Sequence, residues 1–269
     1  MALKTKGSRE QTVWSEKDFA DGRDRFWEFG KLRLWIRKTG KEWHCAPVYE
    51  DRPADPPRLG EPGEAPGDLS WNRFVTGEET VLDVVPVLPD RPVILRPEAP
   101  MKILGSSNAE LFLYIPVWLK VNAVTASGRL TLTEFPSEFL SSSWFGDMKT
   151  GELCYSFRGT LYPRPLVPPE DHSHAVCPLT IRNSSQAILD FQRFCVRCVH
   201  LTLYAGDANL FTNEIRIRFS GEDQSSQVVF AAKPPEASEP LSVIAQPRVP
   251  YSSSILKKSF GFLRTLTEM

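Results

Sequence analysis

The sequence predicts an all-β protein of β-sandwich architecture. Three runs in series alternate apolar and polar residues, which is the pattern of strands with one buried face. They cover residues 175–181, 187–203 and 213–219. In the last run Ile215, Ile217 and Phe219 share one face, which predicts a half-buried antiparallel strand. Proline, with 23 residues against 16 of glycine, often lies between apolar runs, where it favours strand ends over helices.

Length and charge limit the classes of protein that fit. The chain has 269 residues and is 41% hydrophobic, which is enough to bury the core of one large or two small domains. Lysine plus arginine number 32 against 33 acidic residues, so the chain has no basic field that would hold a nucleic-acid backbone. We therefore expect no nucleic-acid partner.

The cysteines and the N-terminus favour a cytoplasmic protein with reduced thiols. Five cysteines is an odd number, and the first residues lack the apolar stretch of a secretory signal. No segment approaches the roughly 20 apolar residues that span a bilayer. We therefore expect all five cysteines to be free, namely Cys45, Cys154, Cys177, Cys195 and Cys198.

The N-terminal half begins with a charged segment, residues 1–25, and continues with a predicted hairpin. Leu32, Leu34 and Ile36 share a face, residues 38–41 supply a turn, and residues 43–48 return. Residues 50–69 are rich in proline, glycine and charge, which predicts a surface loop or linker.

Further strands follow. Residues 79–89 and 92–95 are β-branched and bounded by proline, and residues 111–121 alternate cleanly. Aromatic residues on the second face of the 111–121 run predict that it is covered on both sides, and Pro116 indicates an edge position or a bulge. Residues 127–133 complete this set of strands, and residues 135–143 form a connector.

Several motifs along the chain resemble one family. The central ones are Trp144-Phe-Gly-Asp147, Gly151-Glu-Leu-Cys-Tyr155, Val176–Asn183 and Leu201–Tyr204, and the upstream ones are Trp27–Trp35, Val85–Val93 and Ile115–Trp118. The chain resembles the uncharacterised prokaryotic family catalogued as domain of unknown function 432, over roughly residues 26–233. The resemblance brings no established chemistry and no catalytic residue. It implies an association with mechanosensitive-type channels, beside which some members are encoded.

Two short motifs contain metal-binding residue types. Cys195 and Cys198 have the spacing of half a zinc knuckle, but residues three apart on a strand point to opposite faces, so we interpret both as small buried hydrophobes. His172 and His174 share a face in an extended strand and could share an ion, with Cys177 nearby. The alternative is a solvated loop, because both histidines follow the proline-rich run 162–169. We predict no bound metal and no cofactor.

The family motif around residue 144 supplies the candidate site. We expect Trp144, Phe145, Asp147, Glu152 and Tyr155 to form a functional surface. Asp147 and Glu152 bracket a turn, so they are either an acid/base pair or, more simply, turn-forming residues. The chain has neither a dinucleotide fingerprint nor a phosphate loop. An enzyme is therefore the secondary hypothesis.

These observations divide the chain and set two functional hypotheses. We expect a β-rich domain at 26–143, an immunoglobulin-like sandwich at 144–233 and a linker with a tail at 234–269, or else one continuous sandwich. The leading hypothesis is a protein-interaction or scaffolding module, acting with a membrane protein such as a mechanosensitive-type channel. The alternative is a hydrolase or metal-dependent enzyme with its site near Asp147, Glu152, His172 and His174.

The tail carries a further expectation. Apolar residues recur at helical spacing among positive charges, which predicts a short amphipathic basic helix. Such a helix docks in a partner's groove or lies on an anionic membrane surface, at the periphery of the inner membrane, or it packs back on its own sandwich. The residues concerned are Leu256, Phe260, Leu263, Lys257, Lys258 and Arg264.

Overall fold

The structure is a computed structural model of the chain, and it describes most of the residues between 22 and 251. The described residues are 14, 17, 19, 22–77, 80–99, 101–146, 148–149, 151–159, 161–163, 171–207, 209–221, 226–237 and 240–251; of residues 52–55 and 171 the backbone alone is described. Asp147 and the tail from residue 252 onward, for which we predicted a helix, lie outside the described residues.

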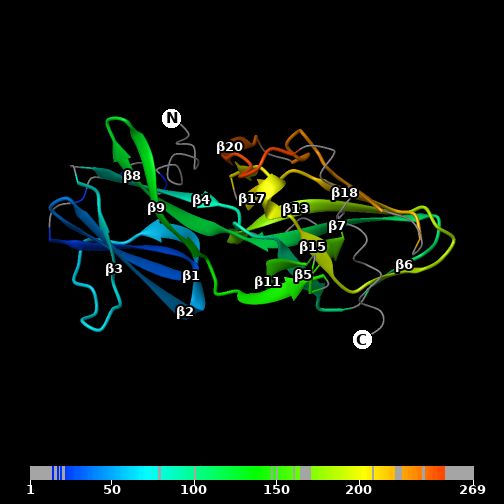
Figure 1. The fold of residues 1–269 in the computed structure, drawn as a ribbon, viewed down its shortest axis with the longest axis horizontal. Coiled ribbons are helices and arrows are strands. Elements are labelled where there is room, and N and C mark those ends of the chain that lie inside the picture. The colour runs from blue at the N-terminus through cyan, green and yellow to red at the C-terminus, as the bar shows by residue number, and fades with distance from the viewer. Residues whose placement is uncertain are drawn as a thin grey trace, which may run out of the picture. The chain divides into compact units, whose positions relative to one another are not determined.

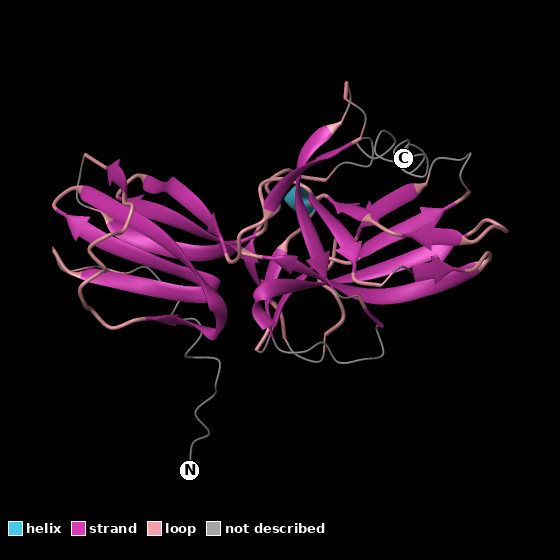
Figure 2. Cartoon of the chain, turned by 90° about the horizontal axis from the view of Figure 1, so that it is seen from below, coloured by secondary structure: helices cyan, strands magenta, loops and turns pink. Residues whose placement is uncertain are grey.

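The prediction of an all-β fold is confirmed. Within the described residues the chain forms twenty strands and one short 3-10 helix, η1 (Cys198–His200) (Figure 2). No helix in this part of the chain is long and apolar enough to cross a membrane.

The chain divides into two compact units that alternate along the sequence. Unit 1 comprises residues 1–87, 116–139 and 171–173, and unit 2 comprises residues 88–115, 140–170 and 174–269. We expected a single boundary near residue 143, but the chain passes from one unit to the other several times. Residues 88–115 therefore belong with the C-terminal half of the sequence.

Unit 1 is built from two three-stranded antiparallel sheets. The first sheet has the order β1-β2-β3 and the second the order β4-β8-β9. The strands are β1 (Asp24–Thr39), β2 (Glu42–Leu59), β3 (Asn72–Val75), β4 (Val81–Val87), β8 (Trp118–Thr125) and β9 (Gly128–Pro136) (Figure 1).

A buried tryptophan connects the first sheet to the start of the second. Trp27 on β1 and Trp43 on β2 are buried, and both rings pack against Phe19. The indole N–H of Trp43 donates to the hydroxyl of Thr80, the residue before β4, at 2.7 Å. A buried indole needs such a partner, so the bond fixes the first sheet against the start of the second.

The predicted hairpin of residues 32–48 is confirmed, but the predicted loop at 50–69 is partly wrong. Strands β1 and β2 pair in antiparallel register from Thr39 opposite Glu42, and β2 continues to Leu59. β3 pairs with β2 only along Glu42–Cys45, so the distal half of β2 is an edge strand. Proline is tolerated there because its missing N–H faces no second neighbour.

Unit 2 contains the remaining strands. One sheet has the order β12-β7-β13-β17-β16-β20, with β18 beside β13 and β19 beside β18; the others are β10-β11-β5-β15 and β14-β6. The strands are β5 (Val93–Pro97), β6 (Met101–Ile103), β7 (Ser107–Pro116), β10 (Ser141–Phe145), β11 (Glu152–Gly159), β12 (Tyr162–Pro163), β13 (Asp171–Asn183), β14 (Leu189–Phe191), β15 (Phe194–Val196), β16 (Leu203–Ala205), β17 (Asn209–Thr212), β18 (Ile215–Phe219), β19 (Gln227–Phe230) and β20 (Ser242–Ala245).

Three details of unit 2 correct the strand predictions. β18 has the expected alternation of buried and exposed residues, but it pairs with β13 in parallel and only with β19 in antiparallel register. β11 also pairs with β5 in parallel. Both parallel pairs depart from the immunoglobulin pattern, whose sheets are antiparallel. The run 187–203 is not one strand but β14, β15 and η1 up to the start of β16.

The regular alternation of residues 111–121 extends over two separate strands. β7 ends at Pro116 and β8 begins at Trp118, and the boundary between the units falls just before Pro116. Proline cannot donate to a strand ladder, which explains why one run serves two sheets.

Candidate functional site

The family-motif residues come together on one hairpin of unit 2. β10 and β11 pair in antiparallel register, with Trp144 opposite Leu153 and Phe145 opposite Glu152. Neighbouring residues on a strand point to opposite faces, so the hairpin has two chemically different sides. Trp144, Leu153 and Tyr155 belong to one side, and Phe145, Glu152 and Cys154 to the other.

The first side presents apolar side chains to solvent. Trp144 is 51% exposed, Leu153 is 43% exposed, and Met148 in the connecting turn is 95% exposed. We call these three residues the exposed face. Isolated exposed apolar residues are common, but Trp144 and Leu153 form a cross-strand apolar pair, and the exposed Met148 lies in the turn that joins their strands.

Tyr155 lies on the same side and is held by charged neighbours. Its hydroxyl donates to the Oδ1 of Asp90 at 2.9 Å, and the Arg91 guanidinium lies over its ring, 5.5 Å from the centroid. Burial raises the pKa of Tyr155 to about 12, and the hydrogen bond to Asp90 adds to that shift. The Tyr155 phenol is therefore held in place and neutral on the same side as the exposed face, and it does not act as an acid or a base.

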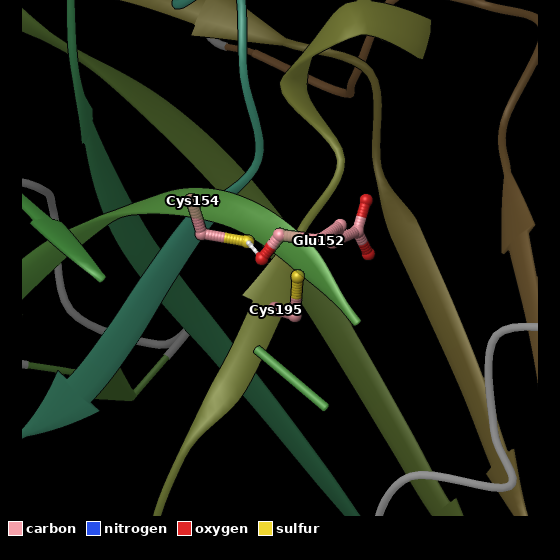
Figure 3. Close-up of side chains that lie close together, drawn as sticks. All are labelled: Glu152, Cys154 and Cys195. Atoms are coloured by element: carbon pink, nitrogen blue, oxygen red, sulfur yellow. Dashed lines mark hydrogen bonds between the residues drawn. The ribbon is translucent and has the colours of Figure 1, made fainter. Parts of the chain in front are cut away.

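The second side brings two cysteines and a carboxylate together. Glu152 and Cys154 project from β11, and Cys195 projects from β15 (Figure 3). Their sulfur and carboxylate atoms all lie within 4.8 Å of one another, and Cys154 and Cys195 are buried beside Ile94 and Phe145. We call Glu152, Cys154 and Cys195 the thiol cluster. A carboxylate oxygen of Glu152 accepts a hydrogen bond from Arg197.

The pKa values of the two thiols in the cluster shift in opposite directions. A hydrogen bond from Cys195 lowers the pKa of Cys154, and the Arg197 charge lowers it further. The same hydrogen bond, together with burial, raises the pKa of Cys195. Loss of a proton from Cys154 therefore leaves a thiolate that accepts a hydrogen bond from the Cys195 thiol.

The remaining cysteines behave as the sequence predicted. All five are free and buried. Burial raises the pKa of Cys45 to about 12, which makes it an inert thiol. Cys198 is the first residue of η1, and its thiol donates to the carbonyl of Val196 at 3.5 Å. Cys195 thus joins Cys154, which is distant in sequence, and not its near neighbour Cys198.

The histidines do not join the thiol cluster. His172 and His174 both lie on β13, and His174 packs against the ring of Phe157 at 5.7 Å between centroids. Within the described part of the chain, neither belongs to a group of three side chains that could hold a metal ion. Of the proposed acid/base pair, Glu152 forms an ion pair with Arg197, and Asp147 is outside the described residues.

Comparison with known families decides where the chain belongs. The model of the family described as "Protein of unknown function (DUF432)" matches residues 13–264, nearly the whole chain. The chain belongs to the DUF432 family. The resemblance found in the motifs is therefore confirmed, and the match extends beyond the residues 26–233 that carry them. No curated protein and no solved structure matches this DUF432 chain.

The family motif of the DUF432 chain predicted one functional surface, but the structure divides its residues between the two sides of the hairpin. Trp144 and Tyr155 lie on one side, and Glu152 and the buried Phe145 lie on the other. The pairing of Cys154 with Cys195 was missed, since β5 and its residue Ile94 lie between their strands in the sheet and no spacing along the sequence signals it. Only the register of β11, β5 and β15 places the two sulfurs on one face.

Proposed function

We propose that unit 2 is a protein-interaction module whose contact surface is the exposed face of the β10–β11 hairpin. The observation that carries this proposal is the half-exposed Trp144 directly opposite the exposed Leu153. Tryptophan contributes strongly to interfaces, because a rigid ring of large area loses water on contact at a small cost in side-chain entropy.

Charges around the exposed face indicate what kind of segment it binds. Arg91 lies over Tyr155, and the charges of Arg91 and Arg248 both act on that phenol. Lys149 lies in the exposed turn beside Met148, and Asp90, which pairs with Arg91, is the one carboxylate among the described residues of this group. The surroundings are thus apolar and net positive. The fitting partner is a polypeptide segment that carries apolar and acidic side chains.

Selection of peptides from a random display library against the full chain tests this proposal. We expect the enriched peptides to combine apolar with acidic residues. Trp144→Ser and Leu153→Ser should each weaken their binding about tenfold or more, because an interface anchor contributes about 2 kcal/mol or more. Titration of a labelled selected peptide, followed by fluorescence anisotropy, measures the affinity.

The matched control is Val229→Ser, since Val229 is 46% exposed on β19 of the same unit. This variant should bind the peptides as the parent chain does. The proposal fails if no peptides are enriched, or if Val229→Ser and Trp144→Ser weaken binding equally. Thermal melts of all three variants show that each is folded.

A second candidate function rests on the thiol cluster, which we propose binds a divalent thiophilic metal ion such as Zn²⁺. Two thiolates on tetrahedral zinc are about 3.8 Å apart when each Zn–S bond is about 2.3 Å. The ligand atoms of the cluster lie within 4.8 Å of one another, so a contraction of about 1 Å would suffice. This candidate departs from our prediction that the chain binds no metal.

Charge balance supports a metal ion at the thiol cluster. Two thiolates and the Glu152 carboxylate carry three negative charges, which a divalent ion and the Arg197 guanidinium neutralise; a buried site needs that balance.

Cobalt substitution tests the metal candidate. Co²⁺ added to the reduced chain should give the near-ultraviolet thiolate-to-cobalt charge-transfer band, and Zn²⁺ should abolish it at one equivalent. Cys195→Ser should remove most of the band, whereas Cys198→Ser, which alters an equally buried thiol outside the cluster, should retain it. A thiolate band that survives in Cys195→Ser, or no band in the parent chain, would exclude the metal site.

A further inference from the structure

Three arginines stand in one row across the sheet that carries the thiol cluster. Arg158 on β11 is the registered partner of Arg96 on β5, in parallel pairing. On the other side of β5, Phe194 pairs with Leu95, so Arg193, the residue before β15, comes opposite Arg96. Registered partners project from the same face of a sheet about 5 Å apart. We call Arg158, Arg96 and Arg193 the arginine row.

The side-chain contacts agree with this placement. Arg96 donates a hydrogen bond to the hydroxyl of Ser156, which is two residues before Arg158 and therefore on the same face of β11. The register of β15 brings Arg193 opposite Arg96, and both side chains are partly buried.

The row is electrostatically unfavourable by itself. Like charges opposite each other on neighbouring strands repel, and partial burial reduces the screening by water. Among the described residues, no carboxylate oxygen lies within 4.0 Å of any of the three guanidinium groups, whereas Arg197 on the same face has Glu152. Asp190, the nearest acidic residue before Arg193 along the chain, contacts Lys102 and Gln192 instead.

A second arginine pair in the same unit shows what a solvated arrangement looks like. Arg182 on β13 and Arg218 on β18 are also registered partners, but both are exposed, so water screens their charges. The arginine row differs in that two of its three members are partly buried. Partly buried cations without a carboxylate partner are expected where an anion completes the site.

We infer that the arginine row is a binding site for a ligand that carries phosphate groups. A guanidinium presents its donors in a planar fork that matches the oxygens of a phosphate, and three of them on neighbouring strands extend over about 10 Å. The phosphate comes either from a free phosphorylated molecule or from a lipid headgroup. The site lies on the opposite side of β11 from Leu153 and Tyr155, so this inference is independent of the interaction function proposed above.

Two probes separate the two sources of phosphate. Pyrophosphate is titrated into the full chain by calorimetry, and phosphatidylcholine vesicles with and without phosphatidylglycerol are used in co-sedimentation. We call the probe that binds the parent chain the active probe. We expect Arg96→Gln and Arg193→Gln to weaken its binding about tenfold or more, because each substitution removes a charge-assisted pair of hydrogen bonds. Arg218→Gln removes one positive charge from the solvated pair of Arg182 and Arg218, and it should change the affinity for the active probe by less than about twofold.

Thermal melts distinguish a ligand site from a structural role. Without ligand, Arg193→Gln should melt at or above the temperature of the parent chain, because it relieves repulsion. The active probe should raise the melting temperature of the parent chain and not that of the variant. Binding of pyrophosphate alone assigns a free phosphorylated ligand, and binding of anionic vesicles that depends on Arg96 assigns a lipid headgroup. The inference is overturned if neither probe binds, or if Arg218→Gln weakens binding as much as Arg96→Gln does.

Discussion

Replacement of Gly30 by alanine should destabilise unit 1 by about 2–5 kcal/mol. Gly30 lies between two register shifts of β1 and has a φ of 58°, a conformation that costs alanine about 1–2 kcal/mol. A Cβ added there would lie 2.7 Å from the Cβ of Ser173 and 3.1 Å from the carbonyl oxygen of Ser137. Overpacking of this kind costs about 1–3 kcal/mol more.

The matched control for this substitution is Gly40→Ala in the turn between β1 and β2. Gly40 has nearly the same φ, 56°, but nothing lies within 4 Å of its added Cβ. The difference between the two variants therefore isolates the steric contribution. Urea unfolding followed by tryptophan fluorescence reports on unit 1, which contains every tryptophan except Trp144. Equal losses of stability would mean that backbone strain alone determines the effect.

Replacement of Ile217 by alanine should destabilise unit 2 by about 2–5 kcal/mol, through lost burial and the cavity that remains. Ile217 is buried on β18 between Ile181 of β13 and Val228 of β19. Its neighbour Arg218 is exposed, so Arg218→Ala should change stability by about 0.5 kcal/mol or less.

Thiol labelling measures this second effect within unit 2. Cys177 is fully buried on β13 and becomes reactive only when that strand opens. Its labelling in increasing urea should shift to clearly lower urea in Ile217→Ala and remain at the parent value in Arg218→Ala. Similar shifts in the two variants would contradict the assignment of the buried face.

The hairpin β10–β11 also accounts for why the two proposed kinds of site lie so close together. Alternation along β11 sends Leu153 and Tyr155 to one side and Glu152, Cys154 and Arg158 to the other. An apolar contact surface and a charged, sulfur-containing face are thus the two sides of a single strand. Substitutions on one side should leave the other unchanged, which allows the proposed functions to be tested separately.

The local pattern of the sequence by itself determined the fold class, the β1–β2 hairpin and the buried face of β18. Ile215, Ile217 and Phe219 are buried and Arg216 and Arg218 exposed, as the alternation predicted. Burial of alternate residues follows from the period of a single strand, so a short stretch of sequence suffices to predict it. Trp144, Glu152 and Tyr155 were grouped by the resemblance of their motif to a family, and not by this alternation.

Only the tertiary structure decided which strands pair, and therefore which side chains lie together on each face of a sheet. The parallel pairing of β5 with β11 brings Arg96 beside Arg158, and the position of β15 brings Cys195 to Cys154. Alternation states which way a side chain points, but it carries no information about the neighbouring strand or its register. Those depend on burial of apolar surface across the whole unit, which joins segments that are distant in sequence.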